Sequence, residues 1–404
     1  MFKKTGQLKK VAKNKGKCAR LIYALPVLMM CTALLAGASE KAIPDVFYTD
    51  KVQTAGFAPQ TSVTATSGNI SDNIYTAKLF GILPTKTVTA TLPSDLYLVP
   101  GGDVFGVKFF TKGVVITDMS EVESEEGIIC PAKKAGLKNG DVVLSVNGKE
   151  LESADSLTQH IESCGGKELE LEFVRDGKNY KAKLLPVKAI ADGAYKMGMW
   201  VRDSTAGIGT VTYYNPDDGS FAGLGHGIYD TDTELLLPLQ RGAVVSIDLE
   251  DVVKGREGHP GELKGSFGSE KCGTVLKNTP VGVFGVLAYT PQAAYDKIAC
   301  AIKSEVTEGA ATILSNVDGK GVKEYNIEIV KIYSGNEETK NFVIEVKDDR
   351  LAQLTGGIVR GMSGSPILQH GKLVGAVTHV MVNDPMRGYG IFIENMLAEA
   401  EKIK

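Results

Sequence analysis

The sequence contains few cysteines, and no two of them lie close together. The six cysteines among 404 residues are Cys18, Cys31, Cys130, Cys164, Cys272 and Cys300. No two of them form a CxxC pair, which argues against zinc ribbons and thioredoxin-like redox motifs, and no disulfide framework is indicated. An HExxH motif is also absent, so an intramembrane metalloprotease is not supported. We therefore expect no metal and no other cofactor.

Excess charge of one sign is also lacking, because the net charge is −3, and no nucleic-acid partner is expected. The charge is nevertheless uneven. Residues 1–20 carry lysines and an arginine but no acid, and residues 21–39 carry no charge. Such a pattern directs a chain to a membrane with its basic end in the cytoplasm. We predict a cytoplasmic segment at 1–20 and a transmembrane signal anchor at 21–39, with the body outside the cytoplasm. A cleaved signal is the alternative, since Ala36-Gly37-Ala38 fits a cleavage site.

The next segment, residues 40–96, is rich in serine, threonine, alanine and proline. We interpret it as a stalk, with short strands in "YTAKLFGILPTKTVTATL" at 75–92.

Residues 97–187 contain closely spaced turn signals around short apolar runs. In "PAKKAGLKNGDVVLSVNG" at 131–148, a proline opens a short helix and Asn147-Gly148 predicts a hairpin turn. A helix with a capping serine and an alternating strand pair follow. This order resembles a PDZ domain, which implies a groove that binds an extended peptide, flanked by the strand at 106–110 and the helix at 156–163. The alternative is a closed structural domain without a ligand.

Strand-like runs separated by glycine-rich turns dominate residues 188–404. Helical patterns are confined to about 291–302 and the last dozen residues. Many short strands over this length favour a barrel or sandwich, and the length suits a pair of small barrels. The expected fold class is therefore mainly β.

One motif in this region points to chemistry. "GMSGSP" at 361–366 matches the G-x-S-G-[GS]-P pattern of chymotrypsin-like serine peptidases. Glycines around Ser363 let the backbone N–H groups of Gly361 and Ser363 point into one small space, where they can hold an oxyanion. We therefore predict Ser363 as a nucleophile in a chymotrypsin-like double β-barrel.

A serine nucleophile needs a positioned base. Of the five histidines, His226 lies between two glycines early in this domain, and chymotrypsin-like folds place the base in the first barrel. We predict His226 as the base; the alternative is a hydrogen-bonded turn histidine. His379 follows the nucleophile on a strand and is expected to pack beside the site. Spacing alone does not select the acid. The candidates are Asp248, Asp251, Asp296, Asp318, Asp348 and Asp349.

"FAGLGHGI", "TGGIVRGMSGSPI" and "GAVTHVMVNDPMRGYGIFIENML" resemble the stage IV sporulation protein B family of serine endopeptidases. In that family an anchor, a PDZ domain and a peptidase occur in this order. The resemblance implies Ser363 as nucleophile, His226 as base and Asp348 as the acid, with Asp349 as the neighbouring alternative.

The resemblance also implies a location and partners. The protein would be exported from the forespore into the space between two membranes, where it would cut itself near its N-terminal region. It would also cut a regulator of an intramembrane protease that matures a mother-cell sigma factor.

Two other functions remain open. One is a quality-control peptidase of the HtrA type, although such enzymes place the peptidase before the PDZ domain. The other is a PDZ adaptor with an inactive barrel.

The sequence says little about substrate specificity. Gly357 lies six residues before Ser363, a position that often forms the floor of the S1 pocket in this fold. It is not acidic, so a preference for lysine or arginine gets no support.

Overall fold

The computed structural model describes residues 46–48, 61–65, 74–79, 83–91, 96–288, 295–333 and 339–401. The chain divides into two units, Met1–Pro93 and Ser94–Lys404. The predicted segments 1–20 and 21–39 lie outside the described residues. Within the described residues, no helix is both long enough and apolar enough to span a membrane.

The first unit contains a four-stranded sheet. Its strands, in the order β1-β4-β3-β2, are β1 (Val46–Tyr48), β4 (Leu83–Thr91), β3 (Ile74–Leu79) and β2 (Thr61–Ala65). The strands predicted within 75–92 are therefore confirmed as β3 and β4. Threonines alternate with other residues in β4, as suits a pleated strand.

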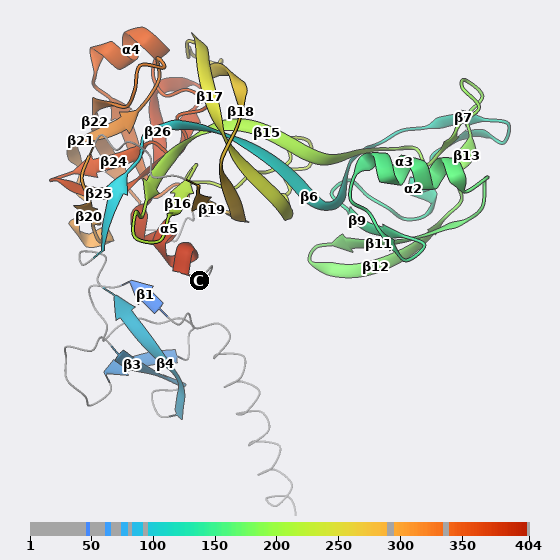
Figure 1. The fold of residues 1–404 in the computed structure, drawn as a ribbon, viewed down its shortest axis with the longest axis horizontal. Coiled ribbons are helices and arrows are strands. Elements are labelled where there is room, and N and C mark those ends of the chain that lie inside the picture. Colours follow the sequence, from blue (N-terminus) through green and yellow to red (C-terminus); the bar gives the residue numbers. More distant parts are fainter. Residues whose placement is uncertain are drawn as a thin grey trace, which may run out of the picture. The chain divides into compact units, whose positions relative to one another are not determined.

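The second unit contains two barrels of six strands each (Figure 1). The first consists of β6 (Val104–Met119), β17 (Leu239–Val253), β18 (Glu262–Thr279), β19 (Gly282–Leu287), β16 (Ser220–Gly223) and β15 (Met199–Tyr214), and pairing of β15 with β6 closes it. The second consists of β21 (Gly309–Ser315), β22 (Lys323–Ile332), β23 (Phe342–Val346), β26 (Asp384–Phe392), β25 (Lys372–Met381) and β24 (Pro366–Gln369). The predicted pair of barrels is confirmed.

Alternating side chains fill the second barrel. In β22, Tyr325, Ile327 and Ile329 are buried while the residues between them are more exposed, as a half-buried strand requires. The predicted terminal helix is present as α5 (Ile393–Ala400), and α4 (Asp349–Thr355) precedes the nucleophile loop. The helix predicted at about 291–302 is wrong over its described part, because residues 298–299 form the short strand β20 (Ile298–Ala299).

The PDZ domain has its own core. Its sheet runs β12-β11-β9 and continues into β6, and two helices pack against it. These elements are β12 (Lys178–Leu184), β11 (Leu169–Arg175), β9 (Val142–Val146), α2 (Pro131–Lys134) and α3 (Ala154–Ser163). The predicted capping serine is Ser153, whose side chain accepts from the backbone N–H of Ser156. Leu157 is the buried residue of α3.

Short strands complete the second unit. They are β5 (Tyr97–Pro100), β7 (Val122–Ser124), β8 (Gly127–Ile129), β10 (Lys149–Glu150), β13 (Val187–Lys188) and β14 (Tyr195–Lys196), and a 3-10 turn covers Lys303–Glu305.

Strands β6 and β15 belong to both the PDZ domain and the first barrel. They pair from Met199 opposite Met119 to Thr210 opposite Val104. The later part of β6 pairs with β9 of the PDZ domain, whereas its earlier part pairs with β17 of the barrel. The PDZ domain is therefore inserted into the first barrel between these two strands.

This insertion corrects two predictions. The expected division into a PDZ domain at 97–187 and a peptidase at 188–404 does not follow the sheets, because Val107 and Phe109 lie in the barrel core. The strand at 106–110 also cannot flank the peptide groove, since β15 and β17 already pair with its two edges. Among the described strands, the Met199–Val201 part of β15 pairs with β6 alone. It therefore keeps one edge free.

Candidate active site

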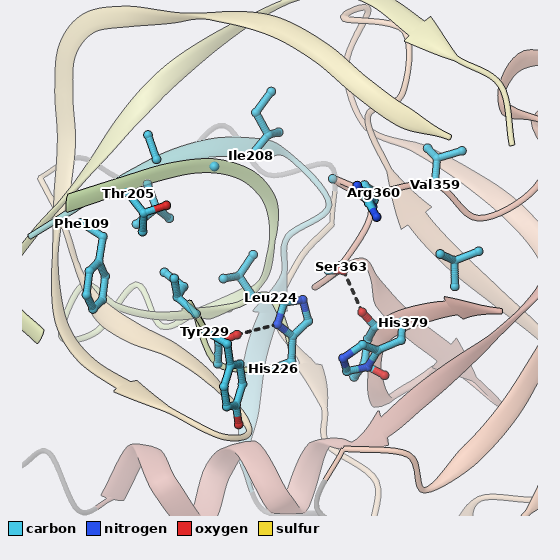
Figure 2. A pocket seen from close by; sticks show the side chains of 18 of the residues that line it. Phe109, Thr205, Ile208, Leu224, His226, Tyr229, Val359, Arg360, Ser363 and His379 are labelled. Carbon is cyan, nitrogen blue, oxygen red and sulfur yellow. Dashed lines mark hydrogen bonds between the residues drawn. The ribbon is translucent and has the colours of Figure 1, made fainter. Parts of the chain in front are cut away.

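A cavity of about 390 Å³ is lined by residues of both barrels. The first barrel contributes β15 residues 205–208 and the loop around His226, and the second contributes residues 358–361, Ser363 and residues 378–380 of β25. Figure 2 shows Ser363, His226 and His379 around this space. The structure therefore brings the predicted nucleophile and base to one cavity.

The nucleophile loop needs glycine at two positions. Gly361 and Gly364 have φ of +99° and +98°, a region that side chains rarely adopt. A Cβ on Gly364 would also lie 2.0 Å from the carbonyl oxygen of Thr210. The sequence "GMSGSP" thus folds into a tight loop pressed against strand β15.

Two amides of this loop have no acceptor among the described residues, namely the N–H groups of Gly361 and Ser363. The amides that alternate with them are bonded: Met362 donates to the carbonyl of Val359 at 3.1 Å, and Gly364 donates to Val377 at 2.7 Å. A loop with two free amides beside a serine can receive a negatively charged oxygen.

The hydroxyl of Ser363 donates a hydrogen bond of 2.7 Å to the main-chain carbonyl of Thr378 (Figure 2). Its acceptor is therefore a carbonyl of β25 rather than a histidine. Catalytic hydrogen bonds are often long or unformed without substrate, so this contact describes the resting position of the side chain.

The backbone before His226 turns sharply, with φ of 69° at Leu224 and 67° at Gly225. The Nδ1 atom of His226 lies 2.7 Å from the carbonyl oxygen of Gly227. Since a carbonyl can only accept a hydrogen bond, Nδ1 carries the proton. Nε2 is then the basic nitrogen. Burial lowers the pKa of His226, and the bond to Gly227 opposes this effect. The imidazole is thus neutral near pH 7, as a general base must be.

His379 lies beside His226, with ring centroids 4.9 Å apart and planes inclined by 34°. Its Nδ1 is buried and has no hydrogen-bond partner among the described residues. Burial, followed by the nearby His226 and Lys340, lowers the pKa of His379 to about 4. Two neutral rings can therefore sit side by side without repulsion.

The structure does not bring Asp348 to this cavity. Asp348 is the N-cap of α4 and accepts from the backbone N–H of Arg350, and its carboxylate forms an ion pair of 2.8 Å with the guanidinium of Arg350. The Gly227 carbonyl occupies the place beside His226 Nδ1 where the resemblance implied a carboxylate. The neighbouring Asp349 is exposed on the first turn of α4.

Among the residues that the structure describes, no acidic residue lines the cavity, so none of the other candidate aspartates reaches it either. The sequence could not reveal the Gly227 and Thr378 carbonyls, because every residue has one. Gly357 does not line the cavity: a Cβ there would meet the carbonyl oxygen of Pro385 at 2.2 Å. Ile358, Val359 and Val380 line it instead and give it apolar walls.

A second cavity, of about 650 Å³, lies in the PDZ domain. It is lined by Leu157 and Ile161 of α3, by residues 195–198 and by Met199–Val201 of β15. The groove thus lies between α3 and the free edge of β15. The predicted helix is confirmed, whereas the strand is β15 and not the predicted strand at 106–110. An extended peptide can add to such an edge.

Two barrels, a serine in a glycine-rich loop and a neutral histidine across one cavity define a serine endopeptidase. The sequence pattern of the SpoIVB peptidase S55 family matches residues 193–397, about half of the chain, and the chain belongs to this family. The PDZ domain pattern matches residues 129–175. The predicted family and PDZ domain are confirmed.

Curated relatives include a probable periplasmic serine endoprotease DegP-like from Chlamydia trachomatis, 29% identical over 37% of this chain and 32% of that protein. A putative zinc metalloprotease of Lactococcus lactis, LL2128, is 34% identical over 26% of this chain and 23% of its own length. The chain thus spans a third or less of these relatives. Among solved structures, the Rv3671c protease of M. tuberculosis in its active form matches with a TM-score of 0.30 and 14% identity, over 49% of this chain and 74% of that one.

Proposed function

We propose that Ser363 is the nucleophile and His226 the general base of this endopeptidase. The observation that carries the proposal is their position on one cavity, with His226 Nδ1 held by a carbonyl and Nε2 left basic. No charged partner is needed to fix the tautomer, because the Gly227 carbonyl does so.

In the proposed reaction, the Ser363 hydroxyl turns from the Thr378 carbonyl toward His226. Nε2 takes its proton while Oγ attacks the peptide carbonyl, and the new oxyanion accepts from the N–H groups of Gly361 and Ser363. The imidazolium then gives the proton to the leaving amine, and an acyl ester remains on Ser363. Water, deprotonated by His226, hydrolyses this ester and restores the hydroxyl.

The cavity favours an apolar residue on the acyl side of the cleaved bond. Ile358, Val359 and Val380 line it, and none of its described lining residues is a carboxylate that could pair with lysine or arginine. Binding energy there comes from burial of apolar surface.

We place this activity in sporulation signalling, in an exported and membrane-anchored protein that cuts itself and a regulator of an intramembrane protease complex. Family membership, the basic and apolar N-terminal pattern and a PDZ groove for a protein segment support this role. The self-cleavage site is expected in the stalk, residues 40–96.

The test is a timed incubation of the full-length protein beside its Ser363→Ala variant, with N-terminal sequencing of the fragments. The wild type should shorten and react with a fluorophosphonate, and the variant should do neither. Retained cleavage in the variant would overturn the assignment of the nucleophile. For the signalling role, a Ser363→Ala allele in the source organism should block maturation of the mother-cell sigma factor, and normal maturation would exclude that role.

A further inference from the structure

Two buried threonines of β15 reach across to the nucleophile loop of the other barrel. Thr210 and Thr212 are both completely inaccessible to solvent. The hydroxyl of Thr210 donates to the carbonyl of Gly361 at 2.8 Å, and its N–H donates to the carbonyl of Ser363 at 2.9 Å. The hydroxyl of Thr212 donates to the carbonyl of Gly364, also at 2.8 Å.

In four consecutive peptide units of the loop, the carbonyl oxygen accepts a hydrogen bond. The carbonyls of Arg360 and Met362 accept from the N–H groups of Leu263 and Ser365, each at 2.9 Å. Those of Gly361 and Ser363 accept from Thr210. Because C=O and N–H point in opposite directions in a trans peptide, each bond also fixes where the following amide points.

These bonds determine where the two free amides point. The N–H of Gly361 shares a peptide unit with the Arg360 carbonyl, and the N–H of Ser363 shares one with the Met362 carbonyl. The unit between them, Gly361–Met362, is held at its carbonyl by the Thr210 hydroxyl. Gly361 has no Cβ to oppose rotation, so release of this unit would loosen the link between the two peptide units that carry the free amides.

We infer that Thr210 is a positioning residue for the oxyanion site, acting from the barrel that does not carry the nucleophile. This inference rests on the proposed role of Ser363 and its loop. Among the four donors that hold these units, the Thr210 hydroxyl is the one that belongs to a side chain, so a substitution can remove it. A β-branched residue also suits the place, because its χ1 angle is restricted and the hydroxyl stays directed at the loop.

The first test compares Thr210→Val with Thr210→Ser in the full-length protein, assayed on a peptide that spans the self-cleavage site. Valine keeps the shape but removes the donor, whereas serine keeps the donor. We expect Thr210→Val to lower kcat by about 10- to 100-fold, with KM within about twofold, because the loss falls on transition-state binding. Thr210→Ser should stay within about threefold of the wild type. A peptide boronic acid, which forms a tetrahedral adduct on the serine, should lose affinity for Thr210→Val in parallel with kcat.

Thr212→Val is the matched control. It also removes a buried threonine hydroxyl of β15 that bonds to this loop, but its acceptor unit, Gly364–Ser365, does not lie between the two units that carry the free amides. It should lower the melting temperature about as much as Thr210→Val while kcat stays within about threefold. If Thr210→Val does not fold, Thr210→Ser and Thr210→Ala give the same comparison, since they differ by the hydroxyl alone.

The outcomes separate this inference from the proposed function. Thr210→Val with unchanged kcat, beside an inactive Ser363→Ala, would refute the role of Thr210 and leave the nucleophile in place. An active Ser363→Ala would refute both. Equal losses of kcat in Thr210→Val and Thr212→Val would show a general packing effect and would also overturn the inference.

Discussion

Substitution of Asp348 tests whether its carboxylate acts in structure or in catalysis. A side-chain bond from Arg350, helped by the backbone amides of Asn326 and Arg350, outweighs the effect of burial and lowers the pKa of Asp348 from 3.8 to about 2. A shift of this size corresponds to about 2 kcal/mol of folding free energy. Because the Arg350 side chain is 65% exposed, solvent weakens the pair and this is an upper value.

Asp348→Asn keeps an N-cap residue but removes the charge. We expect it to lower the free energy of unfolding at pH 7 by up to about 2 kcal/mol, or about 4–8 °C in melting temperature for a domain of roughly 200 residues. A depressed pKa stabilises the fold above the unfolded value of 3.8, and this contribution is lost as the pH falls toward about 2. The difference between wild type and variant should therefore shrink over that window.

Calorimetry at pH 7, 5 and 3 in a Ser363→Ala background, where self-cleavage is absent, measures the stability effect. Activity is measured separately with Ser363 intact, and kcat/KM should stay within about threefold, because Asp348 does not line the cavity. Asp349→Asn, at an exposed first-turn position, is the control and should cost no more than about 1 kcal/mol. An Asp348→Asn protein of unchanged stability but with kcat reduced a thousandfold would refute this reasoning and restore Asp348 as the acid.

Three further predictions concern the cavity. His226→Ala should lower kcat by several orders of magnitude and His379→Ala by less than about tenfold, and the reverse order in a peptide assay would reassign the base. Because burial lowers the pKa of His226, the acidic limb of kcat/KM should lie below pH 6.5, and a limb above pH 7 would contradict a buried neutral base. In a peptide library, cleavage should follow apolar residues, since Ile358 and Val359 line the cavity; preferential cleavage after lysine or arginine would show that another surface binds this residue.

The nucleophile loop could be predicted from the sequence because its constraints are local. Gly361 and Gly364 need positive φ, and glycine is the residue that adopts it without strain. His226 was recognisable for a similar reason, since Gly225 allows the turn that presents it. Both arrangements follow from short-range backbone geometry, which a few letters of sequence can encode.

The extent of β6 was not predictable in the same way. Lys112-Gly113 suggests a turn between two strands, yet β6 runs unbroken from Val104 to Met119. Gly113 has φ of +78°, and the Thr111 hydroxyl donates to its carbonyl at 2.6 Å, so the glycine makes a local irregularity within the strand. The choice between a turn and a continuous strand depends on β15 and β17, which lie about a hundred residues away in the sequence.

The groups that surround His226 were even harder to predict from the sequence. The group that holds His226 Nδ1 is a main-chain carbonyl, which leaves no mark in the sequence. Asp348 precedes α4, a helix that was not predicted, and it is the N-cap, a position that aspartate prefers. Aspartate suits both a cap and a catalytic acid, and the geometry supports the cap.

Insertion of the PDZ domain into a barrel determines which pieces of this chain can fold alone. Phe109 of β6 is fully buried in the first barrel, and loss of such a side chain alone costs about 3–5 kcal/mol. A domain is stable by only about 5–15 kcal/mol, so residues 188–404, which lack all of β6, should not unfold cooperatively in calorimetry. Phe110 and Ser204 face each other across β6 and β15, so a two-residue Asn-Gly turn in place of residues 111–203 should instead close a hairpin and give a cooperative transition. A cooperative transition for 188–404, or none for the hairpin variant, would mean that these strands do not belong to the barrel in solution.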